Sequence, residues 1–393
     1  MKSFDVVIIG AGAAGLMCAI SAGKRKLSVL IIDHAKNVGE KIRISGGGRC
    51  NFINLNVKPT NFLSQNPNFC ISALKRFTSH DFIQLVEKHK ISYHEKTLGQ
   101  LFCDNSSKQI IEMLLAQCKE GDVEIWTETN AQRIEKNDEG FVIATNKENL
   151  VCKSLVIATG GLSIPKMGAT DFGYKVAKQF GLNIIPPTPA LVPLVLKPDL
   201  LEETKNLAGV AVCEVTATCN KKTFKEAILF THKGLSGPVI LQISSYWQEN
   251  QTIIINFAPK IDVLSLLLEE KSRNPKKEIS NLLNTILPKS LVGYLIKKAD
   301  CKGFLAEISN QKLKVLANSI NNWQVIPEST EGFAKAEVTL GGIDTDEISS
   351  KSFESKKVPG LFFIGEVLDV TGHLGGYNFA WAWSSGFAAG EFV

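Results

Sequence analysis

The sequence of 393 residues has little net charge, few histidines and no clustered metal ligands. Lys and Arg number 44 against 39 Asp and Glu, which leaves a formal net charge of +5, and no long basic block stands out. Because proteins that bind nucleic acid concentrate positive charge on one surface, we expect no nucleic-acid partner. The six histidines are scattered, with no HExxH and no Cys/His cluster, so we also expect no metal site.

Paired cysteines and long apolar runs are also missing. The nine cysteines are odd in number and include no CxxC, which is typical of a reducing environment. The apolar stretch after Lys2 resembles a signal peptide, but Asp5 interrupts it and glycines at fixed spacing explain it better. No apolar run reaches the roughly 20 residues of a membrane-spanning helix. We therefore expect a cytoplasmic protein without a membrane span, of unknown oligomeric state.

The first 33 residues follow the pattern of strand, glycine turn, helix and second strand. Short β-branched runs at 6–9 and 27–32 predict two buried strands. Three glycines in the spacing GxGxxG stand between them, and an acidic residue follows 18 positions after the last: Gly10, Gly12, Gly15 and Asp33. The first glycine permits a tight turn, the second lets backbone approach a pyrophosphate, and the third lets the helix pack on the strand. The segment predicts a dinucleotide site without distinguishing FAD from NAD.

A second glycine-rich segment, ISGGGRCNFIN, occupies residues 44–54. A flexible linker would account for the glycines at 46–48, but linkers rarely carry polar groups packed as closely as Arg49, Cys50 and Asn51. Two later segments also end apolar runs in glycine. LVIATGG at 155–161 is a strand entering a small turn, and the strand near 361 ends at Gly365 and Glu366, before a glycine-rich loop and a helix that we expect to start near Asn378.

These strings together resemble one family of flavoproteins. The segments GEKIRISGGGRCNFIN, LVIATGG, LFTHKGLSGPVIL, EVTLGGI and GEVLDVTGHLGGYNFAWAWSSG are similar to those of the HI0933-like family, also called BaiN-like or YhiN. More distantly the chain resembles the fumarate reductase and aspartate oxidase group. The resemblance implies an FAD-dependent oxidoreductase in which the loop at 46–48 lies against the cofactor and the last helix aims its N-terminus at the flavin pyrimidine.

The motif and the resemblance together assign the cofactor-binding residues. They are Gly10, Gly12, Ala13, Ala14, Gly15, Asp33, Lys41, Gly46, Gly47, Gly48, Arg49, Cys50, Asn51, Ala158, Thr159, Gly160, Gly161, Gly365, Glu366, Gly376, Asn378, Phe379 and Ala380. Two positions depart from the family pattern. Asp33 stands where the group commonly has Glu, and His373 stands where the family often carries Arg, which leaves a role of this loop in binding substrate charge open.

The middle of the chain differs in pattern from both ends. Four prolines between 186 and 193 mark a boundary. We predict an α/β fold with a Rossmann-like FAD domain at 1–190 and 330–393, of the two-dinucleotide-binding type. An insert at 191–329 interrupts it, barrel-like and β-rich over 191–260 and helical over 261–329. The crevice between the two domains is the expected substrate site.

Four residues are candidate proton donors or substrate clamps: Tyr377, His373, Arg49 and His232. A structural hydrogen bond is an equal alternative for each. The resemblance implies reduction or desaturation of a C=C bond conjugated to a carbonyl in a small molecule. Oxidation of a small amine and a flavin-bound RNA-modifying protein are the alternatives. No second nucleotide fingerprint occurs, since GATDFGYK at 168–175 misses the P-loop pattern, so NAD(P)H enters only as a transient electron donor.

Overall fold

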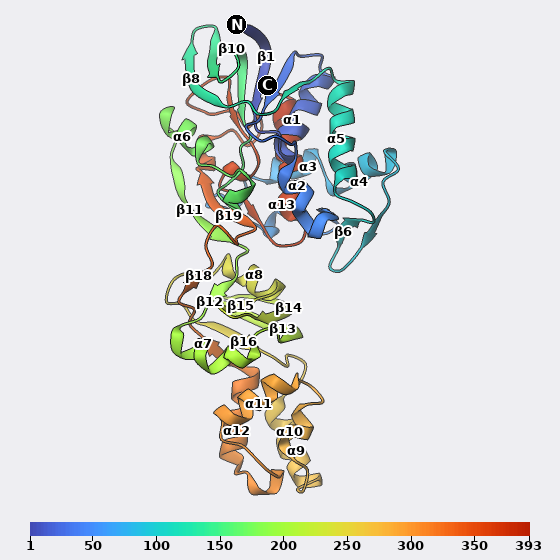
Figure 1. Ribbon diagram of the computed structural model, residues 1–393, viewed down its shortest axis with the longest axis vertical. Helices are drawn as coiled ribbons and strands as arrows, with labels where there is room; N and C mark the ends of the chain where they lie inside the picture. The colour runs from blue at the N-terminus through green and yellow to red at the C-terminus, as the bar shows by residue number, and fades with distance from the viewer. The chain divides into compact units, whose positions relative to one another are not determined.

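The computed structural model describes residues 1–393, which divide into two compact units. Unit 1 combines Met1–Thr188 with Val338–Val393, and unit 2 is the continuous segment Pro189–Glu337. Each unit has its own apolar core. Figure 1 shows the two ends of the chain, blue and red, interleaved within unit 1.

Unit 1 is built on a seven-stranded sheet. Its parallel strands are, in spatial order, β7 (Glu124–Trp126), β2 (Val29–Ile32), β1 (Lys2–Ile9), β10 (Leu150–Ile157) and β20 (Leu361–Phe363). The antiparallel hairpin β8 (Ala131–Asn137) and β9 (Gly140–Thr145) extends the sheet from the first half of β10. Val6 to Ile9 and the whole of β2 are buried, as their continuous β-branched runs require in a parallel sheet covered on both faces.

Two helices from opposite ends of the sequence pack against each other in unit 1. They are α1 (Ala13–Lys24) and α13 (Tyr377–Gly390), which lie side by side in Figure 1. The contact depends on small residues: an added Cβ on Gly386 would overlap the carbonyl oxygen of Ala14, and one on Gly390 would meet Ser21. The apolar α13 is therefore buried against the first helix of the chain instead of covering the surface.

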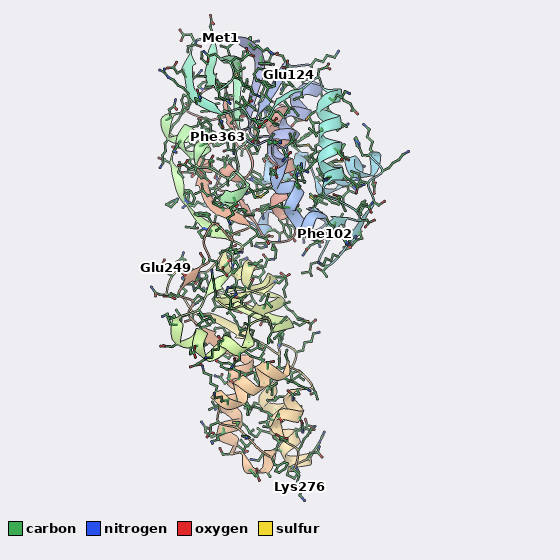
Figure 2. All side chains as sticks on the ribbon, viewed as in Figure 1. Met1, Phe102, Glu124, Glu249, Lys276 and Phe363 are labelled. Carbon is green, nitrogen blue, oxygen red and sulfur yellow. The ribbon has the colours of Figure 1, made fainter.

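Unit 1 also contains further helices and three small sheets. They are α2 (Glu40–Gly48), α3 (Ile71–Arg76), α4 (Ser79–Lys88), α5 (Lys108–Glu120), α6 (Phe172–Gln179), a three-stranded sheet of β3 (Asn51–Asn54), β6 (Gln100–Cys103) and β5 (Tyr93–Glu95), and the two-stranded pairs β21 (Thr371–Gly372) with β4 (Phe62–Leu63) and β11 (Ile184–Ala190) with β19 (Val338–Ile343). Figure 2 shows Phe102 on the small sheet and Phe363 within the main sheet. The small sheet leads directly from the glycines of α2.

Unit 2 combines one antiparallel sheet with helices. The strand order is β17 (Trp323–Val325), β16 (Ile253–Asn256), β13 (Ala211–Cys219), β14 (Lys222–Phe230), β15 (Gly234–Ser236), β12 (Leu194–Val195) and β18 (Ser329–Thr330). Here the structure differs in detail from a barrel-like insert, because β17 and β18 end the order and do not pair with each other. β17 pairs with β16 and β18 pairs with β12, so the sheet is open.

The helices of unit 2 are α7 (Pro198–Thr204), α8 (Pro238–Ser244), α9 (Val263–Arg273), α10 (Ile279–Leu283), α11 (Lys289–Lys298) and α12 (Asn310–Asn321). We call α9 to α12, residues 263–321, the helical part of unit 2. Each of its helices buries one apolar face in the core that also contains the sheet, as the period of the apolar residues predicts. No helix in the protein is long and apolar enough to cross a membrane.

Candidate functional site

The turn between β1 and α1 is packed too tightly for side chains at two of its three glycines. The amide of Gly10 donates to the carbonyl of Ile32 at 2.9 Å, which ties the turn to β2. An added Cβ at Gly10 would overlap the carbonyl oxygen of Ala158, and one at Gly15 would overlap the carbonyl oxygen of Gly10. The first and third glycines of GxGxxG are therefore required by contacts within the protein itself.

Gly12 is different, because nothing in the protein lies within 4 Å of a Cβ placed there. It is the N-cap of α1, with φ −85° and ψ −170°, and it makes no side-chain capping bond. This backbone conformation suits any residue, so neither strain nor packing calls for glycine at this position. The open space faces the unpaired amides that begin every helix, and a phosphate group fits there.

Thr159 lies beside the dinucleotide turn, with its hydroxyl covered by protein. Its Oγ1 is buried and has no hydrogen-bond partner within the protein. Thr159 follows Ala158, the residue against which Gly10 packs, at the end of β10. A Cβ on Gly173 of α6 would stand 2.4 Å from this oxygen, so α6 covers the hydroxyl and it does not face open space. The next residue, Gly160, faces open space.

The carboxylate of Asp33 is held by backbone at the end of β2. Oδ2 accepts from the amide of Ala11 at 2.6 Å, and Oδ1 accepts from the amide of Ala35 at 2.8 Å. The side chain is 15% exposed, with the ring of His34 3.7 Å from Oδ1. Asp33 thus fixes the glycine turn against β2 and keeps lone pairs for a further donor, such as a ribose hydroxyl.

The triple-glycine segment forms a break inside α2. Gly46 and Gly47 both adopt left-handed conformations, with φ of 57° and 66°, after Ser45 leaves the helical region. A Cβ on Gly46 would also press on the ring of Phe102, whereas Gly47 and Gly48 face open space. The segment is thus a definite backbone turn, with Arg49 exposed at its end.

The residues after the glycines turn inward and hold the site together. Cys50 is fully buried, and burial raises the pKa of its thiol to about 12, so it is not a thiolate. Asn51 begins β3. The buried Asn54 donates from Nδ2 to the carbonyl of Gly375 at 2.8 Å, which joins β3 to the loop before α13. Cys50 therefore acts as a packing residue.

A polar cluster connects four distant segments of unit 1. Lys41 Nζ donates to Ser163 Oγ at 2.7 Å and to Glu366 Oε2 at 2.9 Å. Ser163 Oγ donates to the other carboxylate oxygen of Glu366 at 3.1 Å, and the amide of Thr339 donates to that oxygen at 2.9 Å. The ion pair is partly exposed, 34% for Lys41 and 18% for Glu366. Lys41 and Glu366, both predicted as cofactor residues, are thus paired with each other.

The segment before α13 is held by side chains of that helix. The amide of Gly365 donates to Ser385 Oγ at 3.1 Å, and Trp381 Nε1 donates to the carbonyl oxygen of Gly365 at 3.0 Å. The side chain of Asn378 binds both backbone groups of Gly372, at 2.8 and 2.9 Å. Asn378 therefore shapes the loop, and the helix start beside it, with Phe379 and Ala380 in its first turn, has no side-chain cap.

The structure brings two of the four catalytic candidates together. The rings of His373 and Tyr377 lie 6.1 Å apart, nearly perpendicular, and His373 is only 9% exposed. Both stand on the loop and first turn of α13. Arg49 lies exposed at the end of the triple-glycine segment, also in unit 1. His232 is exposed on the turn between β14 and β15 in unit 2, and so belongs to a separate unit from the other three.

Three residues of this region were not among the predicted site residues. Ser163 and Thr339 join the polar cluster, and Tyr174 on α6 has a buried hydroxyl without a hydrogen-bond partner. Burial, and then the charge of Glu366, raise the pKa of Tyr174. Ser163 follows Gly161 by two positions, and Thr339 lies in EVTLGGI. Both residues could therefore have been found from their position in or near a segment that resembles the family.

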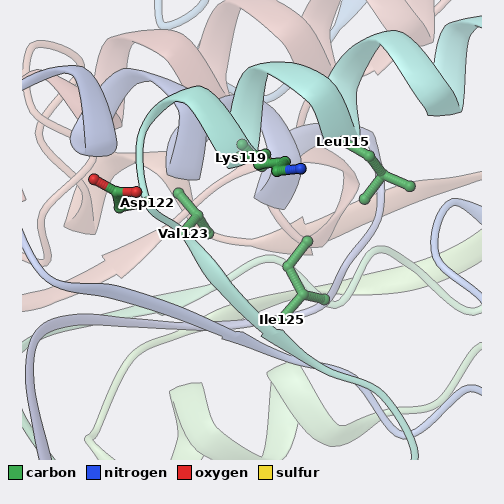
Figure 3. Close-up of a pocket in the computed structure, with 6 residues that line it drawn as sticks. Leu115, Lys119, Asp122, Val123 and Ile125 are labelled. Atoms are coloured by element: carbon green, nitrogen blue, oxygen red, sulfur yellow. The ribbon is translucent and has the colours of Figure 1, made fainter.

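A hollow elsewhere in unit 1 has no part in this chemistry. It lies between the end of α5 and β7, and is lined by Leu115, Cys118, Lys119, Asp122, Val123 and Ile125. Figure 3 shows aliphatic side chains there with one lysine and one aspartate. The group that could act as a nucleophile, Cys118, is buried, and burial raises the pKa of its thiol to about 12.

The chain is similar over nearly its whole length to known proteins. Residues 4–392 match the HI0933-like protein Rossmann domain family. The chain is 51% identical over its full length, and 98% of the relative's, to "Ribosomal RNA dihydrouridine synthase" of Escherichia coli (strain K12). It is 28% identical, over 98% of this chain and 97% of the relative, to "3-dehydro-bile acid delta(4,6)-reductase" of Clostridium scindens.

A solved structure of quinol-fumarate reductase with menaquinol molecules shares the fold. It matches 99% of this chain and 70% of that chain at a TM-score of 0.51 and 14% identity. The predicted distant likeness to the fumarate reductase group is confirmed at the level of the fold.

The expectation that no nucleic acid is involved is wrong. The relative that is half identical over the whole chain is named for ribosomal RNA. The prediction failed because it used the net charge of the whole chain, which averages over regions of different charge.

The predicted family, the Rossmann-like α/β fold and the flavin-dependent class of enzyme are confirmed. The chain belongs to the HI0933-like protein Rossmann domain family and is an FAD-dependent oxidoreductase.

Proposed function

We propose that this protein reduces the C5–C6 double bond of a uridine in ribosomal RNA to give dihydrouridine. The observation that carries the proposal is the 51% identity to a ribosomal RNA dihydrouridine synthase, which extends over the full chain and so includes both units. Over such a match the two proteins share their fold. An RNA-modifying flavoprotein, an alternative from the sequence, is thus preferred to an enzyme of small molecules.

The chemistry agrees with the bond type that the sequence predicted. In uracil the C5–C6 double bond is conjugated to the C4 carbonyl, as in an enone. FAD, once reduced by NAD(P)H, supplies a hydride when bound. A hydride that adds at C6 leaves negative charge on C5 and O4, and a proton then adds at C5. The product gains two hydrogens, and NAD(P)H loses a hydride.

Three features of unit 1 would hold the cofactor. The open space at Gly12 and the first amides of α1 suit the pyrophosphate. Asp33 suits the adenosine ribose. The N-terminus of α13 would stabilise negative charge on the flavin pyrimidine. The ion pair of Lys41 and Glu366 would hold α2 to the segment after β20.

The proton donor would come from the loop before α13. We assign the proton to Tyr377, because a phenol is a donor at neutral pH and its ring stands on the first turn of this helix. His373, 6.1 Å away ring to ring, would orient it or bind the uracil O4. The exposed Arg49 would bind a phosphate, of the cofactor or of the RNA.

The test is an anaerobic reaction of the FAD-loaded protein with NADPH or NADH, followed by deproteinised ribosomal RNA. We expect one nicotinamide to bleach the flavin, RNA to restore its colour, and the digested RNA to contain dihydrouridine. Flavin that stays reduced with RNA, and nucleosides that are unchanged in mass, would rule the activity out.

Tyr377→Phe sharpens this test. We expect it to slow dihydrouridine formation by about a hundredfold or more with FAD still bound. Tyr93→Phe is the matched control, because its hydroxyl donates to Glu87 at 2.7 Å on the surface. Equal rates for the Tyr377→Phe protein and wild type would remove Tyr377 from the mechanism.

A second candidate is reduction of a conjugated C=C bond in a small ring compound. It is favoured by the 28% identity to a bile-acid reductase over nearly the whole chain. The same flavin assay distinguishes the two functions, since a panel of cyclic enones would restore the flavin colour where ribosomal RNA does not. Amines supplied without nicotinamide test the remaining alternative, an oxidase.

A further inference from the structure

The positive charge of this protein is concentrated in the helical part of unit 2. Residues 263–321 hold ten Lys and Arg against five Asp and Glu, a net +5. The rest of the chain holds 34 of each, since the totals are 44 and 39. The whole formal charge of the protein therefore lies on four helices and their connections, an electrostatic footprint of the kind that nucleic-acid-binding surfaces show.

Many of these basic groups lack an acidic partner. Three of the acids pair with basic residues of the same part, Glu269 with Arg273 at 2.6 Å, Glu270 with Lys277 at 2.8 Å, and Asp300 with Lys312 at 2.6 Å. Five exposed lysines form no ion pair: Lys276, Lys289, Lys297, Lys302 and Lys314. A merely solvated surface usually alternates the two signs of charge, whereas this one leaves cations unneutralised.

An exposed aromatic ring lies on a segment that carries one of these lysines, Lys302. Phe304 is 49% exposed, on the connection between α11 and α12. Its backbone pairs with that of Glu278, and the amide of Leu305 donates to the carbonyl of Lys277 at 3.0 Å. The connection from α11 thus runs beside the one from α9 to α10. Lys276 and Lys302 each lie two residues from the paired positions, and Figure 2 shows Lys276 at the tip of the helical part.

We propose that this tip of the helical part is the docking surface for ribosomal RNA, an inference that rests on the proposed function. Lys276 and Lys302 contact phosphates, and Phe304 stacks on an unpaired base. RNA is preferred to an acidic protein because an exposed ring flanked by unpaired lysines matches both parts of a nucleotide, its π-face and its charge. The pairing of the two connections keeps these groups in a fixed arrangement.

The test uses the FAD-loaded full chain and deproteinised ribosomal RNA. Lys276→Gln with Lys302→Gln should weaken binding about tenfold and reduce the slope of log affinity against log salt by about 2. Phe304→Ala should weaken binding about tenfold with the salt slope unchanged, because stacking involves no released counterion. In the reductase assay both variants should raise KM for RNA with kcat and the flavin spectrum unchanged.

The matched control is Lys75→Gln with Lys88→Gln, two exposed lysines of unit 1 that form no ion pair. It removes the same charge and should bind as wild type does. If the Lys276 and Lys302 variant also binds as wild type does, the docking surface is wrong. Binding to assembled ribosomal subunits but not to deproteinised RNA would also overturn it, in favour of a protein partner.

The two proposals fail separately. If the variants at Lys276, Lys302 and Phe304 form dihydrouridine at the wild-type rate and KM, the proposed activity stands and the proposed docking surface is wrong. If RNA binding depends on these residues but no dihydrouridine forms, the proposed docking surface stands and the proposed activity is wrong.

Discussion

The two glycine-rich segments of unit 1 use glycine for different physical reasons. In the turn at residues 10–15, Gly10 and Gly15 have no room for a side chain because backbone atoms of the protein occupy the space. In the segment at 46–48, Gly47 has open space around it but a left-handed backbone, with φ of 66°. Glycine is required in the first segment because there is no space for a side chain, and in the second because the backbone is left-handed.

Gly12 fits neither case, and that makes it informative. Its backbone angles suit any residue and no protein atom is near its Cβ position. Neither backbone strain nor packing within the protein requires glycine here, so the remaining reason is the close approach of a ligand. Substitutions can therefore separate what each glycine does for folding from what it does for the cofactor.

The largest expected effect is that of Gly15→Val. The new side chain would overlap the carbonyl oxygen of Gly10, so β1 and α1 must move apart. We expect a loss of about 3 kcal/mol or more in the free energy of unfolding together with loss of FAD. Thermal unfolding and flavin absorbance of the purified protein measure both. A protein with the stability of wild type would mean that the turn is looser than described.

Gly12→Val should affect the cofactor alone. We expect the free energy of unfolding of the apoprotein to stay within about 0.5 kcal/mol of wild type, while FAD is no longer retained, because the valine occupies the space open to a pyrophosphate. Titration of apoprotein with FAD gives the affinity. Normal FAD binding with normal stability would contradict the assignment of this space to the cofactor.

A smaller effect is expected at the triple-glycine segment. Gly47→Ala introduces a Cβ at a left-handed position and should cost about 1 to 2 kcal/mol, whereas Gly47→Asn should cost less because asparagine tolerates this conformation. Denaturant unfolding compares the two variants. Equal costs would show that crowding, and not backbone conformation, requires glycine here.

The smallest effect concerns the strand that carries the first turn. Asp5 on β1 accepts from the amide and the hydroxyl of Ser28, at 3.0 and 2.8 Å, and these bonds lower its pKa to about 2. The pKa of Asp5 in the folded protein lies below the ordinary value of 3.8, so this stabilisation is present above about pH 4 and is lost as the pH falls toward 2. Asp5→Asn should destabilise the protein slightly at pH 7, and the difference should shrink in acid. Urea unfolding at pH 7 and pH 3 tests the sign.

Local patterns predicted the parts of this molecule that local physics determines. The buried strands at 6–9 and 27–32, the glycine turn and the helices within 261–329 follow from apolar period and glycine spacing. The ion pair of Lys41 with Glu366 could not be predicted, because nothing near Lys41 in sequence indicates a partner 325 positions away. The same limit hid Ser163 and Thr339, since their hydrogen bonds join segments that meet only in the folded sheet.

The charge of the helical part was hidden for another reason. A net charge of +5 over 393 residues is unremarkable as an average, yet it falls entirely within residues 263–321. Once the helices have bounds, the charge can be assigned to a region. The expected absence of a nucleic-acid partner followed from averaging over the chain.

The discontinuity of unit 1 also sets an order of events during synthesis. The strand β10 pairs with β20, and α1 packs on α13, but β20 and α13 leave the ribosome only after the whole of unit 2. At about 5 to 20 residues per second, the interval from Thr188 to Val338 lasts roughly ten to thirty seconds. Throughout that time β10 has an unpaired edge and α1 an uncovered apolar face. Unit 2 is continuous, so it can fold within this interval, and the cofactor site is completed last.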